Sequence, residues 1–86
     1  MNSVADFISL PINDKIKHLY QQGSFIVSIR YYRYKINLYL IDGFYVEVFY
    51  LHKEDYIEKV ELLNRRSTRM KFYTDQIKLP PLRFNA

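Results

Sequence analysis

The side chains that most often perform acid–base or metal chemistry are few in this sequence and form no recognisable pattern. His18 and His52 lack the HxxxH or HxxE spacing that places catalytic or metal-binding groups on one face of a helix. The chain has no cysteine, which excludes disulfides and thiolate metal sites. Its two glycines, Gly23 and Gly43, are too few for a glycine-rich phosphate loop. The sequence therefore predicts no metal site and no cofactor.

Glu47 and Glu61 are the best candidates for paired carboxylates, because they fall on segments predicted to be neighbouring strands. Such a pair can do general acid–base work. Arg30 and Lys59, however, offer cationic partners on the same predicted sheet face, which favours structural ion pairs over catalysis. Since the sequence shows no nucleophile–base pair, we assign no catalytic residue and predict that the protein is not an enzyme.

The densest cationic cluster consists of Arg65, Arg66, Arg69 and Lys71, which could contact phosphates. The net charge of +4 is compatible with a nucleic acid or an acidic partner, but small soluble proteins often carry as much. A short charge run near acidic neighbours is usually a solvated surface, which is the interpretation we favour. Nucleic-acid binding through residues 65–71 is therefore the alternative function.

Length and composition indicate one small globular domain over residues 1–86. The chain can bury one modest core, and its nine tyrosines and six phenylalanines supply large rings, many of them with a polar tip. The first residues, MNSVADFISLPIND, lack the basic and continuous apolar regions of a signal peptide. No apolar run approaches the roughly 20 residues of a membrane span. A cytoplasmic protein without a membrane partner is expected.

Residues 3–22 have the pattern of two helical pieces. Ser3 is a candidate N-cap for the first piece, and Pro11 interrupts the pattern. A second helix is predicted over residues 13–22, with His18 facing water and Gly23 suited to the position after the helix. The apolar stripe expected to face the core is Ile12, Ile16, Leu19 and Tyr20.

From residue 24 to residue 63 the apolar pattern changes to a period of two, which predicts four strands. The first strand should present one apolar face and reach a turn near Arg33-Tyr34. The residues of that face are Phe25, Val27, Ile29 and Tyr31. The fourth strand, residues 56–63, needs a β-bulge near Glu58-Lys59 to bring its apolar residues to one face. Those residues are Ile57, Val60 and Leu62.

The central hairpin, residues 36–50, turns at Asp42-Gly43, a pair typical of tight turns between strands. A two-residue loop would pair Ile41 with Phe44, whereas a three-residue loop would pair Leu40 with Phe44. The choice matters because a slip of one residue moves every side chain of a strand to the other face of the sheet.

Segregation of apolar and polar side chains favours the three-residue loop. A two-residue loop would leave Asn37 and Glu47 on opposite faces, each among apolar residues. We therefore predict that Gly43 is the left-handed residue of a bulge. The core face of the hairpin would then carry Ile36, Leu38, Leu40, Phe44, Val46 and Val48.

The C-terminal part, residues 67–86, is predicted to contain a short helix from Thr68 to about Ile77, capped by Ser67. A strand over residues 69–73 is the alternative, and Pro80-Pro81 ends regular structure. The predicted fold is α+β: N-terminal helices, a four-stranded antiparallel meander with helix packed on one face, and a short C-terminal helix.

With this register the second sheet face is rich in aromatic residues, and we predict that it binds a partner. The predicted site is Arg30, Tyr32, Tyr39, Tyr45 and Phe49. Tyrosine, phenylalanine and arginine are enriched at protein interfaces, so a homodimer or another protein is the expected partner. Three alternatives stay open for this face: solvated cross-strand pairs, coverage by the chain's own C-terminal segment, and stacking of nucleic acid.

Overall fold

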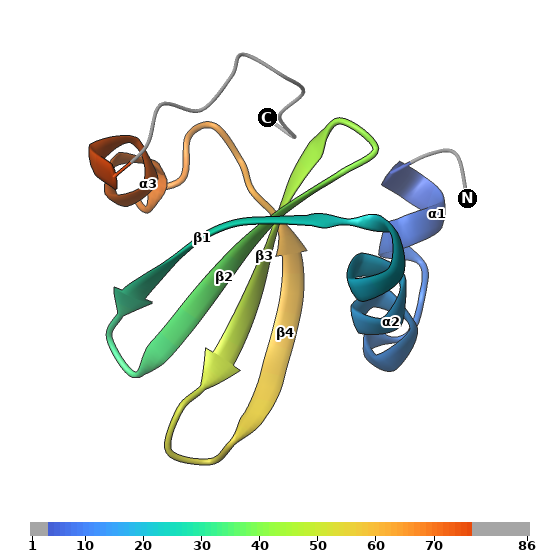
Figure 1. The fold of residues 1–86 in the computed structure, drawn as a ribbon, viewed down its shortest axis with the longest axis horizontal. Helices are drawn as coiled ribbons and strands as arrows, with labels where there is room; N and C mark the ends of the chain where they lie inside the picture. The colour runs from blue at the N-terminus through green and yellow to red at the C-terminus, as the bar shows by residue number, and fades with distance from the viewer. Residues whose placement is uncertain (1–3, 77–86) are drawn as a thin grey trace.

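The computed structural model describes residues 4–76, in which three helices surround one antiparallel sheet (Figure 1). The strands follow one another in the sheet in the order β1-β2-β3-β4. The predicted α+β fold, with N-terminal helices, a four-stranded meander and a short C-terminal helix, is confirmed. The elements are α1 (Val4–Ile8), α2 (Ile12–Gln22), β1 (Ser24–Tyr31), β2 (Tyr34–Ile41), β3 (Phe44–Leu51), β4 (Tyr56–Leu62) and α3 (Met70–Gln76). None of these helices has the length and hydropathy to cross a membrane.

The apolar stripe of α2 is only partly buried. Leu19 is fully buried and Ile16 half-buried, whereas the two ends of the stripe, Ile12 and Tyr20, are exposed. The helix ends at Gln22, and the backbone N–H of the next residue, Gly23, donates to the Leu19 carbonyl at 2.7 Å. A Cβ at position 23 would lie 2.7 Å from the same oxygen, so a larger residue would force the backbone to shift.

The prediction that His18 faces water needs correction. Its Nε2 is buried without a hydrogen-bond partner, and its ring lies 6.0 Å from that of Phe7. The short helix α1 packs against α2 at this point, an arrangement that the stripe of α2 alone did not reveal. The candidate cap of α1, Ser3, lies outside the described residues.

The predicted three-residue loop of the central hairpin is wrong. Ile41 pairs with Phe44, so the loop has two residues, Asp42 and Gly43, with φ of 51° and 81°. Both residues tolerate this left-handed region, and a turn with both φ positive matches the right-handed twist of the flanking strands. Segregation of polar from apolar side chains favoured the longer loop because that loop places Glu47 on a polar face, whereas Glu47 is fully buried.

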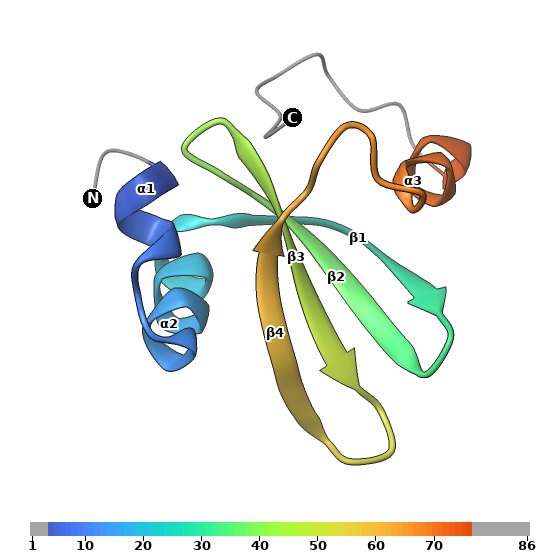
Figure 2. The same cartoon turned by 180° about the vertical axis from the view of Figure 1, so that it is seen from behind.

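With this register the sheet has two apolar faces. We name the first the α3 face, because Tyr73 of α3 packs on it. Its fully buried strand residues include Ile36, Leu38, Tyr45 and Phe49. The second is the α2 face, on which Phe7 and Leu19 pack. Its buried strand residues are Ile41, Val46, Val48 and Val60. Figures 1 and 2 show α1 and α2 at one side of the sheet and α3 at the other.

Two bulges adjust the outer strands. The bulge predicted near Glu58-Lys59 is confirmed, because Tyr50 pairs with Ile57 while Phe49 pairs with Lys59. As expected, it brings three apolar residues of β4 onto one face. These residues, Ile57, Val60 and Leu62, all belong to the core of the α2 face.

The bulge in β1 was not predicted. The register shifts between Phe25 and Val27, so Phe25 pairs with Tyr39 on the α2 face, while Val27 and Ile29 contribute to the core of the α3 face. The expectation that Phe25 shares a face with Val27 is therefore wrong. The turn after β1 lies at Tyr32-Arg33, one residue earlier than predicted, and Tyr32 has a positive φ of 57°.

The C-terminal helix is confirmed and the strand alternative over residues 69–73 is wrong. The Ser67 hydroxyl accepts a hydrogen bond from the Arg69 backbone N–H at 3.1 Å, the kind of contact expected of a cap. The helix itself begins at Met70, two residues later than the predicted start at Thr68. The predicted helix end at Ile77 and the prolines at 80 and 81 lie outside the described residues.

Candidate functional site

The predicted aromatic face is divided by the true register. Tyr45 and Phe49 are 1% and 2% exposed and lie on the α3 face. Arg30 and Tyr39 lie on the opposite face, where Arg30 pairs with Lys35 and Tyr39 with Val46. Tyr32 is in the turn after β1 and is 88% exposed. The five residues do not share one surface, because the one-residue slip exchanged the faces of β3 relative to β2.

The α3 face is covered by a later segment of the same chain. Met70 and Tyr73 of α3 pack against the cluster that contains Tyr45 and Phe49. Coverage by the C-terminal segment was one of the alternatives for the aromatic face, and it describes the position of these two rings. They contribute to the core and are not accessible to a partner.

A buried charged cluster, Glu47–Arg69–Tyr73, fastens α3 to the sheet. Glu47 is 0% exposed, and Arg69 holds its carboxylate through two hydrogen bonds, Nε to Oε2 at 2.7 Å and Nη2 to Oε1 at 2.8 Å. The Tyr73 hydroxyl donates a third hydrogen bond to Oε2 at 2.7 Å. Both carboxylate oxygens therefore have donors, which is the condition for burying a charge at acceptable cost.

The electrostatics of this cluster follow from its geometry. The hydrogen bonds to Glu47 raise the pKa of Arg69, because they favour the charged guanidinium. Burial, together with the nearby Glu47 charge, raises the pKa of Tyr73 and keeps its hydroxyl neutral. Arg69 also lies over the Phe49 ring, 5.1 Å from its centroid. A fully buried carboxylate with all its donors inside the protein has a structural role.

The other predicted polar groups are not brought together into a catalytic site. Glu47 and Glu61 do pair directly across β3 and β4, as the sequence suggested. Glu61, however, faces Lys59, with Nζ and Oε1 3.4 Å apart, and Glu47 is occupied by Arg69. Within residues 4–76 no group of three or more His, Asp or Glu side chains could hold a metal ion.

The predicted basic cluster of residues 65–71 does not form one exposed group, because Arg69 is not at the surface with the others. Arg69 points into the core, where Glu47 neutralises it, so it is not available to a phosphate. Arg65, Arg66 and Lys71 remain exposed on the loop before α3 and on α3 itself. Sequence proximity suggested four cations on one surface, whereas the structure presents three.

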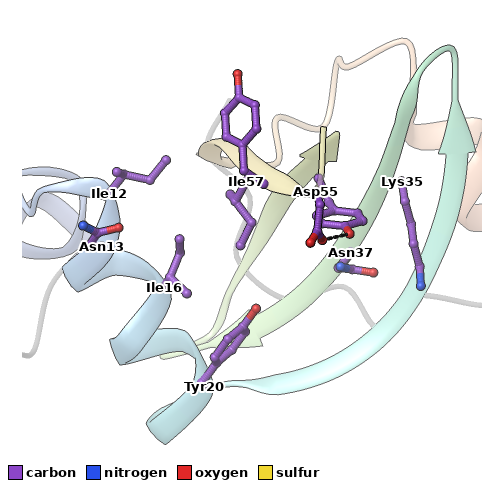
Figure 3. A pocket seen from close by; sticks show the side chains of 10 residues that line it. Ile12, Asn13, Ile16, Tyr20, Lys35, Asn37, Asp55 and Ile57 are labelled. Carbon is purple, nitrogen blue, oxygen red and sulfur yellow. Dashed lines mark hydrogen bonds between the residues drawn. The ribbon is translucent and has the colours of Figure 1, made fainter. Parts of the chain in front are cut away.

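A groove opens on the α2 face, between α2 and the part of the sheet that the helix does not cover (Figure 3). Its volume of about 660 Å³ lies within the roughly 300–1,000 Å³ typical of ligand pockets. Its lining residues, which define the groove from here on, are Ile12, Asn13, Ile16, Tyr20, Lys35, Asn37, Tyr50, Asp55, Tyr56 and Ile57.

The walls of the groove differ in character. Figure 3 shows Ile12, Ile16 and Tyr20 along α2 on one side, with Ile57 of β4 between them and the residues of β2. Lys35 and Asn37 of β2 stand on the other side. Apart from Asn13, the cavity is therefore mainly apolar along the helix, and it is polar along β2.

The polar groups of the sheet wall are largely without partners. Among the described residues, neither the Lys35 amino group nor the Asn37 side-chain amide makes a hydrogen bond or an ion pair. Asp55 differs, because its carboxylate accepts a hydrogen bond from the Tyr50 hydroxyl, which raises the pKa of Tyr50. Lys35 and Asn37 thus retain free donors beside an apolar cavity.

The apolar side chains of the groove are unusually exposed. Ile12, Tyr20 and Tyr56 are 36%, 59% and 52% exposed, and all three line the same cavity. Beyond Tyr20 an aromatic row continues over the sheet: the Tyr20 and Tyr39 ring centroids are 6.0 Å apart, and those of Tyr39 and Phe25 are 5.7 Å apart. Of the predicted site, Tyr39 belongs to this aromatic row, and Arg30 pairs across the strands with Lys35 of the groove.

Sequence reasoning missed the groove although one signal for it was present. The predicted apolar stripe of α2 includes Ile12 and Tyr20. Where such a stripe extends beyond the residues that the sheet buries, its exposed ends form a surface that another molecule can cover. The other wall comes from β2, β3 and β4, whose approach to α2 depends on the folded arrangement. Comparison of the chain with family models, curated proteins and solved structures finds no match, so the functional argument rests on the groove itself.

Proposed function

We propose that the protein is a small non-enzymatic interaction module that binds a segment of a partner protein in the groove. The observation that carries this proposal is that Ile12, Tyr20 and Tyr56, each at least 36% exposed, all line one cavity. Single exposed apolar residues are common on any protein. A contiguous apolar patch rimmed by polar groups, by contrast, is typical of an interaction site.

The shape of the groove supports a peptide segment as its occupant. One wall is a helix, the other is a sheet surface, and the cavity is open, so an extended or helical segment can lie along it. Tyrosines and isoleucines supply contact area, while free donors on β2 can orient the ligand. Tyr39 and Phe25 extend the apolar surface beyond Tyr20.

Selection from a random peptide library tests the proposal and needs no identified partner. Enriched peptides should bind the wild-type protein, and Tyr20→Ala or Tyr56→Ala should weaken binding by about tenfold each, the loss expected of a central interface aromatic. Phe72→Ala is the matched control, because Phe72 is also 36% exposed but lies on α3. The proposal is overturned if no peptides are enriched, or if Tyr20→Ala and Tyr56→Ala both leave peptide binding unchanged.

A second copy of the chain is the other occupant that the experiment must distinguish. Sedimentation at high protein concentration reports it directly. A dimer that Tyr56→Ala dissociates, without loss of the circular dichroism spectrum, would replace the heterologous peptide by a homodimer. A monomer that binds selected peptides supports the proposal as stated.

A further inference from the structure

Two cations of the α2 face lie directly opposite each other. Arg30 of β1 pairs with Lys35 of β2, and the same row continues through Tyr50 to Ile57 of the groove. Like charges directly opposite on neighbouring strands destabilise a sheet. Neither side chain has an ion pair or a hydrogen bond among the described residues. The pair therefore opposes folding mildly and has no anion of its own.

The acidic residues near this end of the sheet offset only part of its positive charge. Asp55 lines the groove, and the hydrogen bond that it accepts from the Tyr50 hydroxyl leaves its negative charge in place. Glu58 accepts a hydrogen bond from the Tyr34 hydroxyl and lies 3.8 Å from Arg33. A neighbouring hollow beside Arg30 adds one more cation and one more anion, Lys53 and Glu54, which offset each other. Together Arg30, Arg33, Lys35 and Lys53 carry four positive charges and Glu54, Asp55 and Glu58 carry three negative ones, so a net charge of +1 remains at the polar side of the groove.

We infer that the groove selects a segment in which a carboxylate lies beside an apolar or aromatic side chain. This inference rests on the proposed function and specifies its partner. The carboxylate of the segment lies against Lys35 and Arg30, and the free Asn37 amide can donate a further hydrogen bond. The neighbouring apolar side chain enters the space between Ile16 and Ile57.

Charge complementarity is the reason for choosing this occupant. A carboxylate relieves the repulsion between Arg30 and Lys35 and offers oxygens to a guanidinium and an ammonium at once. A neutral segment could offer only carbonyl oxygens to Lys35 and Asn37, and it would cover the Lys35 ammonium without a counter-charge, which costs binding free energy. A basic segment would add a third like charge. The same wall therefore favours acidic segments and discriminates against the others.

The test begins with the peptides enriched on the wild-type protein, which should carry Asp or Glu next to an apolar or aromatic residue. One such peptide and its Glu→Gln or Asp→Asn counterpart are then titrated against wild type, Arg30→Gln and Lys35→Gln. Loss of the peptide carboxylate should weaken binding to wild type by roughly five- to tenfold and to the Lys35→Gln protein much less. Lys71→Gln, an exposed lysine on α3, is the charge-matched control and should behave as wild type.

Failure of the inference and failure of the proposed function look different. If selected peptides bind in a groove-dependent way but carry no acidic residue, the carboxylate preference is overturned and the groove stands. The same conclusion follows if the peptide and protein charge changes are additive in their effects on Kd. If no peptide depends on Tyr20 or Tyr56, the proposed function itself fails. Circular dichroism of each variant confirms that the fold is retained.

Discussion

On the α3 face of the sheet, Glu47 is fully buried and three hydrogen bonds satisfy its carboxylate. On the α2 face, Asn37 lies one position away in the paired strand and has no partner among the described residues. Both are polar residues between apolar neighbours, and the hairpin register sends them to opposite faces. What differs is the helix above each: α3 brings donors to Glu47, whereas α2 leaves Asn37 at the edge of a groove.

The comparison shows how the same local pattern acquires two roles. A polar residue that is enclosed and fully hydrogen-bonded fixes the packing of one element on another. A polar residue left beside exposed apolar side chains is available to a ligand. The α3 face is therefore expected to respond to substitution with large losses of stability. The groove is expected to respond with changes in binding and almost none in stability.

Among substitutions at the α3 face, the removal of Arg69 is expected to cause the largest loss of stability. Arg69→Ala leaves the Glu47 charge buried without its main partner and should cost about 3–5 kcal/mol of unfolding free energy, measured by urea denaturation. Arg66→Ala, an exposed arginine on the same loop, should change stability by less than about 0.5 kcal/mol. The pair Glu47→Leu with Arg69→Met should recover most of the loss, because no unpaired charge remains.

If Arg69→Ala proves as mild as Arg66→Ala, α3 does not depend on the buried ion pair. The double variant separates two explanations of a large loss. Recovery indicates that the uncompensated charge caused it, whereas a persistent loss indicates that the Arg69 stem and its packing over the Phe49 ring matter more.

Tyr73→Phe measures how much the hydrogen bond from the Tyr73 hydroxyl to Glu47 contributes to stability. It removes one hydrogen bond to a charged group while keeping the ring, so a loss of about 1.5–3 kcal/mol is expected. Since burial and the Glu47 charge raise the pKa of Tyr73 above its ordinary value of 10.0, the neutral hydroxyl contributes stability that is complete below pH 10. That stability is lost progressively as the pH rises further, because only the unfolded chain then releases the proton.

Urea denaturation between neutral pH and strongly alkaline pH measures this dependence. Wild type should lose stability more steeply above pH 10 than the Phe variant does. The unfolding free energy of the variant should still fall with rising pH, but less steeply, since burial also raises the pKa values of Tyr39 and Tyr45. Equal slopes in the two proteins would contradict the assignment of Tyr73 to the buried cluster.

The turn that assigns residues to the two faces can be tested at Gly43. Gly43→Ala places a Cβ at a φ of 81° and should cost about 1–2 kcal/mol. Asp42→Asn is the control, because asparagine also tolerates the left-handed region, and a change within about 0.5 kcal/mol is expected. NMR contacts between Leu40 and Tyr45 would support the two-residue loop. Contacts between Leu40 and Phe44 as the directly paired residues would refute it.

The smallest effect on stability is expected in the groove. Tyr56→Ala removes a side chain that is 52% exposed and should change the unfolding free energy by no more than about 0.5 kcal/mol. Thermal denaturation of wild type and variant measures this difference. A loss comparable to that of Tyr73→Phe would show that Tyr56 is a packing residue and would remove the contrast between the two faces.

Much of the fold was predictable because its signals are local. The Asp42-Gly43 turn, the period of two from residue 24 and the Ser67 cap each depend on residues a few positions apart. The turn and the strands formed where expected, and the C-terminal helix begins two residues after its predicted start. The bulge near Glu58 was also predictable, since without it the apolar residues of β4 could not share a face. The one local error with wide consequences was the loop length of the central hairpin.

The predicted binding site failed for a non-local reason. Placing Glu47 outward is correct for a sheet considered alone, because a buried carboxylate without donors is costly. Its donors, Arg69 and Tyr73, are separated from it by 22 and 26 residues in the sequence. No periodicity within the hairpin indicates such partners. Once they are in place, the costly register becomes the stable one and the aromatic residues Tyr45 and Phe49 turn inward.

Turn chemistry and apolar periodicity, which act over a few residues, specify the elements of this protein, their order and the antiparallel meander. The face that each side chain occupies, and the surface that stays open, are set only in the folded arrangement. That arrangement depends on how α2 and α3 dock, and docking is governed by contacts between distant segments. The buried Glu47 and the exposed groove are two results of the same placement of helices on a two-faced sheet.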